Sequence, residues 1–230
     1  MTPRARAPYV FDLLGQGARD PSAFSLIVAN LITIELALLE RWDLASVMRI
    51  YWWQSVIIGA FHFIRLTKLR HFHMEGPDES GEIIEPTPAR KTRAAVAFVL
   101  IYGWMHAVYM VFIRQLPAQP PARPYLMAIA VVAFGVNHLF SFLRNIEADA
   151  RKWRSLPGLV RLAHWRVLPM HAMLILGVAF QTSGLGAPLF LALKTIADLV
   201  MHDQEHFMRA DPAPRPTSSG GPGRVGRTDQ

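Results

Sequence analysis

The chain has 230 residues, of which 52% are hydrophobic and only 18% are charged, and its formal net charge is +7. A soluble domain carries about a quarter charged residues, and here the apolar residues form long blocks, so the composition indicates a membrane protein. The chain has no cysteine, which excludes disulfide bonds, thiolate metal ligands and cysteine nucleophiles.

Six apolar segments follow one another along the chain. They are residues 23–39, 45–66, 93–114, 124–144, 163–182 and 186–202. A membrane-spanning helix needs about 20 mostly apolar residues, and the second, third and fourth segments reach that length. The first is interrupted by Glu35, the fifth begins with Arg166 and Pro169, and the short sixth holds Lys194 and Asp198. The pattern predicts an all-α membrane protein with a six-transmembrane-helix bundle.

Two polar segments flank the predicted transmembrane domain, which we place at residues 23–206. Residues 1–22 lack the apolar run of a secretory signal and are expected to be polar or to lie at the membrane interface. Residues 207–230 are rich in Pro, Gly and Ser and have little to bury, so a disordered tail is expected.

The positive charges predict the orientation of the bundle. Most Lys and Arg residues lie in the two terminal segments and in the second and fourth connections, whereas the opposite side holds Arg41, Arg49, Arg114 and Arg123. Basic loops stay in the cytoplasm, so both termini are predicted to be cytoplasmic. Because topology explains the basic surplus, we expect no nucleic-acid partner, and we expect the lipid bilayer as the partner.

This topology places most of the buried polar residues in the cytoplasmic half of the bundle. They are His62, Asn137, His138, Ser141, Arg166, His171, Lys194, Asp198 and His202. Lys and Asp at a helix centre cost about 2.5–3.5 kcal/mol each, which is more than the apolar residues of the sixth segment return. We therefore expect this segment to insert as a hairpin with the fifth and to turn its polar stripe inward. Lys194 and Asp198 are four residues apart and can neutralise each other.

The null hypothesis for single polar residues is interhelical contact. Asn, Ser and His join membrane helices through bonds worth about 0.6 kcal/mol each. Ser55 and Gly59 also form a small-xxx-small pair on the second segment. Contact alone does not explain Arg166, Lys194 and Asp198, because buried charges are too costly for that role.

Five stretches, in this order, resemble the successive motifs of an uncharacterised integral membrane family, DUF6498 (domain of unknown function). They are YWWQSVIIGAFHFIR, MHAVYMVF, NHLFSF, RVLPMHAMLILG and LKTIADLVMH, and the similarity covers residues 20–206. The resemblance implies a polytopic membrane protein in the cytoplasmic (inner) membrane of a prokaryote. Its recurrent polar positions match His106, His138, Ser141, Arg166, His171, Lys194, Asp198 and His202.

The family pattern differs from this chain at two places and supplies no activity. Gln54 stands where an acidic residue is common in the family, and His62 stands where an amide is common. A role for a carboxylate on the second segment is therefore in doubt in this protein.

One chemical hypothesis is a metal site. Neutral imidazole is the commonest transition-metal ligand, and His138, His171 and His202 with Asp198 would suit zinc or iron. A metal-dependent membrane enzyme would then use a metal-bound water as its nucleophile. His206 continues the stripe of His202, but this spacing lacks the Glu that defines the zinc-protease motif.

Two alternatives stay open beside the metal enzyme. Chains of Asp, His and Lys inside a bundle are typical of a small-solute or proton carrier, and Pro169 and Pro188 interrupt helices as in many carriers. The third hypothesis is a non-catalytic membrane scaffold. The sequence does not decide between them.

Overall fold

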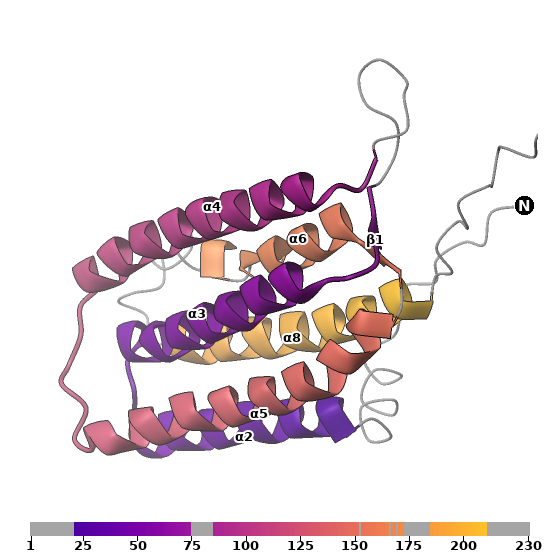
Figure 1. Cartoon of the computed structure of the whole chain (residues 1–230). Coiled ribbons are helices and arrows are strands. Elements are labelled where there is room, and N and C mark those ends of the chain that lie inside the picture. Colours follow the sequence, from indigo (N-terminus) through magenta and orange to yellow (C-terminus); the bar gives the residue numbers. More distant parts are fainter. Residues whose placement is uncertain are drawn as a thin grey trace, which may run out of the picture.

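The computed structural model describes residues 21–74, 85–151, 153–165, 167–168, 170–172 and 185–210. Helices dominate this part of the chain, as Figure 1 shows. They are α2 (Pro21–Leu39), α3 (Leu44–Lys68), α4 (Pro88–Gln115), α5 (Pro124–Arg151), α6 (Leu156–Trp165) and α8 (Gly186–Ala210). Two short strands, β1 (Phe72–His73) and β2 (Arg154–Ser155), pair in parallel.

Five of the six predicted apolar segments lie within helices. The first to fourth fall in α2, α3, α4 and α5, and the sixth falls in α8. The fifth, residues 163–182, lies mostly outside the described residues, as do the predicted terminal segments 1–22 and 207–230.

Local sequence signals explain where α3 and α4 begin. The Asp43 side chain caps α3 by accepting a hydrogen bond of 2.7 Å from the amide of Ser46. Thr87 caps α4 in the same way with the amide of Arg90, and Pro88 follows at the first helical position, where no amide hydrogen is needed. The connection before α3 therefore ends at Asp43, and the connection before α4 ends at Thr87.

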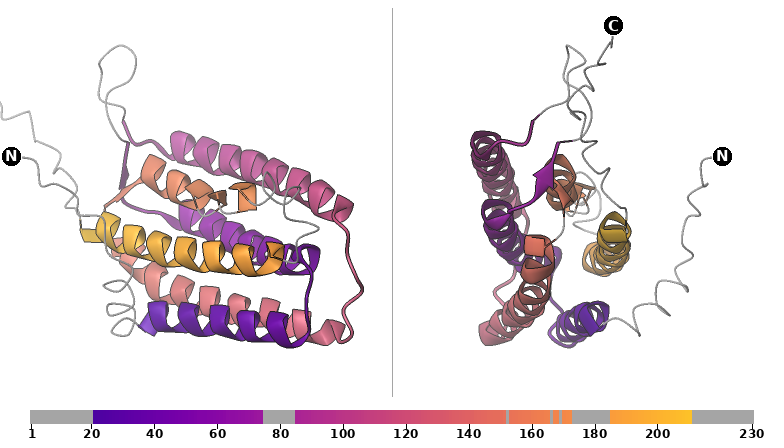
Figure 2. Two further views of the ribbon diagram at one scale, coloured as in Figure 1. Left: turned by 180° about the vertical axis from the view of Figure 1, so that it is seen from behind. Right: turned by 45° about the vertical axis from the view of Figure 1, so that its right-hand side comes forward.

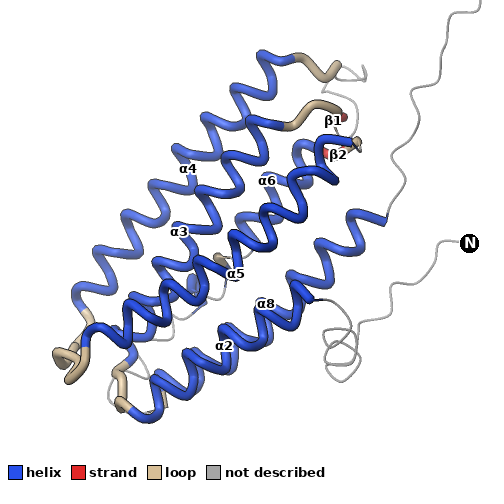
Figure 3. The backbone as a smooth tube through the Cα atoms, turned by 60° about the horizontal axis from the view of Figure 1, so that its bottom comes forward, coloured by secondary structure: helices blue, strands red, loops and turns tan. Residues whose placement is uncertain are grey.

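Helix α3 occupies the centre of the bundle. It packs against α4, α5, α6 and α8, whereas α2 packs against α5 and α8. The helices run along roughly one common direction (Figure 3), and the right-hand view in Figure 2 shows α3 and α4 next to each other, with α8 across the bundle from them. A residue on α3 is therefore close to most of the other helices, which makes α3 the natural site for shared polar contacts.

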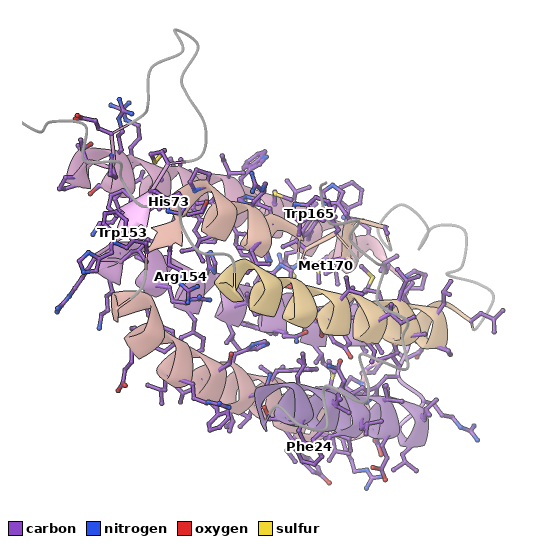
Figure 4. The ribbon with its side chains drawn as sticks, turned by 90° about the vertical axis from the view of Figure 1, so that its right-hand side faces the viewer. Phe24, His73, Trp153, Arg154, Trp165 and Met170 are labelled. Carbon is purple, nitrogen blue, oxygen red and sulfur yellow. The ribbon has the colours of Figure 1, made fainter. Side chains whose placement is uncertain are left out.

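The β1–β2 pair closes one end of the bundle. Phe72 pairs with Arg154 and His73 with Ser155, so the segment after α3 is tied to the segment before α6. Figure 4 shows His73, Trp153 and Arg154 gathered at this end, while Phe24 lies on the outer side of α2. By the predicted topology this is the cytoplasmic end.

Among the residues that the structure describes, two helices are long and apolar enough to cross a membrane: α4 and residues Pro124–Arg144 of α5. Phe24–Leu39 is a shorter apolar helix. The most apolar windows of the two long helices are only 28% and 17% buried, whereas the core helix of a soluble protein is mostly buried. The fold is thus mostly helical, with two candidate membrane spans where the sequence predicts six.

Candidate functional site

A buried ion pair lies on α8. Lys194 and Asp198 are one helical turn apart, and Lys194 Nζ contacts Asp198 Oδ1. Their side chains are only 1% and 7% exposed, so both charges are removed from solvent. Lys194 Nζ also lies 5.4 Å from the ring centroid of Tyr51 on α3, a cation–π contact that further stabilises the ammonium group.

Two amide side chains approach the same carboxylate from other helices. Asn30 Nδ2 of α2 lies 3.4 Å from Asp198 Oδ2, and Gln54 Nε2 of α3 lies 3.5 Å from that oxygen. Asn30 also accepts a hydrogen bond of 3.2 Å from the Tyr51 hydroxyl. Asp198 therefore contacts a cation on its own helix, Lys194, and amide donors on α2 and α3.

A histidine on α5 extends this network. Gln54 Nε2 lies 3.3 Å from His138 Nε2, so Gln54 stands between Asp198 and His138. On the preceding residue, Asn137 Oδ1 accepts a hydrogen bond of 2.5 Å from Ser25 of α2. We call Asn30, Tyr51, Gln54, His138, Lys194 and Asp198 the polar centre.

The polar centre contains one open acceptor. Gln54 is fully buried, and its Oε1 has no hydrogen-bond partner among the residues that the structure describes. A buried amide oxygen normally has a donor, and leaving it without one costs about 1–3 kcal/mol. Gln54 Oε1 is therefore a place where a donor from a bound molecule or a water would be stabilised.

Aromatic side chains pack around the polar centre and help to remove it from solvent. The Tyr51 ring packs against Phe134 of α5 at 5.3 Å and against Phe190 of α8 at 5.2 Å between centroids. Each of these rings is fully buried. The charges consequently lie in a surrounding of low polarity, where electrostatic interactions are strong.

A second cluster lies along α4. His106 Nδ1 donates to the Tyr102 carbonyl at 2.8 Å, the Tyr102 ring stacks on His106, and the Tyr109 hydroxyl contacts His171 Nδ1. With its proton on Nδ1, His106 presents a lone pair at Nε2, and this buried atom has no partner among the described residues. Trp52 of α3 donates to the His106 carbonyl at 2.8 Å, which joins the cluster to α3.

Comparison with known proteins identifies the family. The sequence model described as "Family of unknown function (DUF6498)" matches residues 13–215, nearly the whole chain. The chain belongs to this family. No curated protein and no solved structure matches the chain. The resemblance found in the sequence motifs is confirmed, and the family description gives no function.

The structure brings together some of the residues that the sequence selects. His138, Lys194 and Asp198 belong to the polar centre, and Asn137 lies beside it on α5. His62 lies elsewhere, because its Nε2 contacts the Leu159 carbonyl of α6 at 2.7 Å. His171 belongs to the second cluster through its contact with Tyr109.

Three further predicted residues take no part in the described contacts of the polar centre. Ser141 is half-buried on α5, one turn after His138. Arg166 lies outside the described residues, and His202 lies on α8 but its side chain falls outside the described part of the chain, as does that of His206.

The metal hypothesis gains no support from this arrangement. Within the described residues, no group of three or more His, Asp or Glu side chains could hold a metal ion. Asp198 is engaged by Lys194, and His171 is engaged by Tyr109 in the other cluster. Zinc or iron binding by His138, His171, Asp198 and His202 stays a prediction.

Sequence reasoning overlooked two members of the polar centre, Asn30 and Tyr51. Asn30 lies in the apolar stretch of α2, and Tyr51 lies beside Trp52 and Trp53 on α3. An amide in the middle of a membrane segment was the available signal for Asn30, since such a group needs a partner. No local pattern marks Tyr51, because its role follows from Asn30 and Lys194 on other helices.

Proposed function

We propose that this DUF6498 protein is a multi-pass protein of a prokaryotic cytoplasmic membrane that carries a proton or a small polar solute through the polar centre. In this proposal six helices cross the bilayer and both termini are cytoplasmic. The observation that carries the proposal is the buried Lys194–Asp198 pair inside a bundle with an apolar surface.

The outer surface supports membrane embedding. Large apolar side chains stand exposed along α4 and α5. They include Val99, Leu100, Trp104, Val111, Phe112, Val132, Val136 and Leu143. Water would disfavour so large an apolar patch, whereas the hydrocarbon core of a bilayer accommodates it. Polar residues inside and apolar residues outside are the distribution that a bilayer selects.

The chemistry of the polar centre supports carriage. Protonation of Asp198 would remove the carboxylate charge that faces Lys194 and would change the net charge of this buried pair. The helices that contact Asp198 therefore respond to its protonation. The open Gln54 Oε1 gives a solute with an N–H or O–H group a defined place beside the same carboxylate.

Flux through vesicles tests this function. The full chain is reconstituted into liposomes, and proton flux is followed with a pH-sensitive dye under an imposed gradient, alone and with panels of small amines, amides and polyols. We expect flux above that of empty vesicles and its loss in Asp198→Asn, which keeps the shape of the side chain but cannot titrate.

Thr195→Val is the matched control. Thr195 follows Lys194 on α8, and among the described residues its hydroxyl bonds only to the Leu191 carbonyl of its own helix at 2.8 Å. We expect wild-type flux from this variant. Wild-type flux from Asp198→Asn, or none from the wild-type chain with any solute, would overturn the carrier. Stoichiometric metal in untagged protein that is lost in His138→Ala would favour the metal enzyme instead.

A further inference from the structure

A cavity of about 360 Å³ lies at the other end of the bundle from the β1–β2 pair. Its walls come from the last turn of α2, the first residue of α3 and the first turns of α8, and its volume falls in the range of small-molecule sites. The apolar part of the lining is formed by Ala37, Leu38, Leu44, Ala187, Pro188 and Leu191. The polar part comes from the turn between α2 and α3.

Arg41 stands at this turn in an unusual conformation. Its φ is 50°, and it is the non-glycine residue with positive φ in the described part of the chain. Side chains with a Cβ disfavour this left-handed region, and such conformations concentrate at functional sites. The turn is closed by the Trp42 amide, which donates to the Ala37 carbonyl at 2.9 Å. The strained turn holds the exposed Arg41 against the cavity.

The acidic neighbours of Arg41 already have partners. Glu40 is paired with Arg123 at 2.5 Å, and this hydrogen bond raises the pKa of the Arg123 guanidinium. Asp43 lines the cavity, but its two carboxylate oxygens accept from the amides of Ser46 and Gln119. Among the described residues no side chain pairs with the Arg41 guanidinium, so its charge stays available to a ligand.

Two further donors lie at the cavity. Trp42 is only 6% exposed, and its indole Nε1–H has no acceptor within the described segments. Helix α8 begins at Gly186, which lines the cavity. Pro188 has no amide hydrogen and the Leu189 amide donates to the Leu185 carbonyl, so the amides of Gly186 and Ala187 are the ones at this positive helix end that lack intrahelical acceptors. The cavity thus combines a free cation, a buried donor and a helix N-terminus with apolar walls.

We propose that this cavity binds the anionic headgroup of a membrane lipid. A phosphate or carboxylate oxygen would accept from Arg41, Trp42 Nε1 and the start of α8, while the adjoining acyl carbons contact the apolar walls. Leu38 and Leu39, which are 62% and 70% exposed, continue the apolar path onto the outer surface of α2. The inference goes beyond the carrier function and requires only contact with a bilayer.

Native mass spectrometry of the full chain in detergent tests this site. The probes are phosphatidylglycerol, phosphatidylcholine and inorganic phosphate, each titrated separately. We expect one phosphatidylglycerol to bind more tightly than phosphatidylcholine, and we expect its affinity to fall about tenfold in Arg41→Asn. Asn tolerates the left-handed conformation, so this variant removes the charge without adding backbone strain. Trp42→Phe should lose affinity by a smaller factor.

Arg114→Gln is the matched control. Arg114 is an exposed arginine in the last turn of α4, at the same end of the bundle, and it does not line the cavity. Its loss should leave lipid affinity unchanged. An equal loss in Arg114→Gln, equal affinity for the two lipids, or equal binding of inorganic phosphate alone would each overturn the proposal. None of these outcomes bears on flux through the polar centre.

Discussion

Lys194 and Asp198 form a neutral pair, and the bundle tolerates them inside only because they are together. If Lys194 is changed to Met, the carboxylate keeps its burial and loses its cation, which costs about 3–5 kcal/mol. If Lys194→Met is combined with Asp198→Leu, both charges of the pair are removed together, and the cost should be much smaller. Thermal unfolding in detergent measures both variants.

The same pair of variants separates a structural role from a transport role. A scaffold requires only stability, so a stable double variant would keep every property of a scaffold. A carrier requires the titrating group, so the stable double variant would show no flux. Equal destabilisation of the single and double variants would contradict the prediction, because Asp198 would then not depend on Lys194 for its neutralisation.

At the scale of helices, Gly59 sets how closely α3 and α4 approach. A Cβ on Gly59 would lie 2.9 Å from Cδ1 of Tyr102 and closer still to Cε1. The Tyr102 ring cannot easily withdraw, because its hydroxyl donates to the Ser55 carbonyl at 2.8 Å. The small residues Ser55 and Gly59, which the sequence marks as a contact, thus face a single aromatic side chain of α4.

Gly59→Ala should therefore destabilise the protein by about 1–3 kcal/mol through overpacking. Gly103→Ala is the control on the partner helix, since a Cβ there meets no atom within 4 Å. Because Ala favours a helix over Gly, the control should be neutral or slightly stabilising. Melting temperatures in one detergent compare the two variants, and equal melting temperatures would show that the α3–α4 contact is loose.

The position of a helix along the chain was more predictable than the helices it packs against. Helices α5 and α8 begin where they were predicted but end at Arg151 and Ala210, beyond the predicted residues 144 and 202. The segment predicted at 45–66 is observed as Leu44–Lys68, because apolar length and the Asp43 cap are local properties of the sequence. Helix α6 was not predicted at its observed place, since Leu156–Trp165 starts before the apolar run. A helix that begins at an interface carries a weaker apolar signal than a full span.

The candidate site was predictable in part for the same reason. The Lys194–Asp198 contact follows from i,i+4 spacing on one helix. Contacts of Asp198 with Asn30 and Gln54 depend on how α2 and α3 face α8, which spacing along the chain does not encode. His171 shows where prediction from the sequence fails. Its predicted depth in the membrane suggested that it lies near Asp198, but in the packed bundle it contacts Tyr109.

At the scale of the whole molecule, the apolar surface and the charge distribution together predict a membrane topology that can be tested. Six spans with cytoplasmic termini place the connection between α3 and α4 inside the cell and the connection between α4 and α5 outside. The chain has no cysteine, so a single introduced cysteine reports on one position without background. Glu85 and Ala118 are exposed residues of these two connections.

We expect a membrane-impermeant maleimide to label Ala118→Cys in intact cells and Glu85→Cys only after the membrane is opened. The cysteine-free parent chain is the control for non-specific labelling. Labelling of both positions from one side would contradict a span at α4, which is long and apolar enough to cross a membrane. The cavity lies at the same end of the bundle as Ala118, and the β1–β2 pair lies at the same end as Glu85. Labelling of the two positions from opposite sides would therefore also place the proposed lipid-binding cavity near the outer membrane interface and the β1–β2 pair in the cytoplasm.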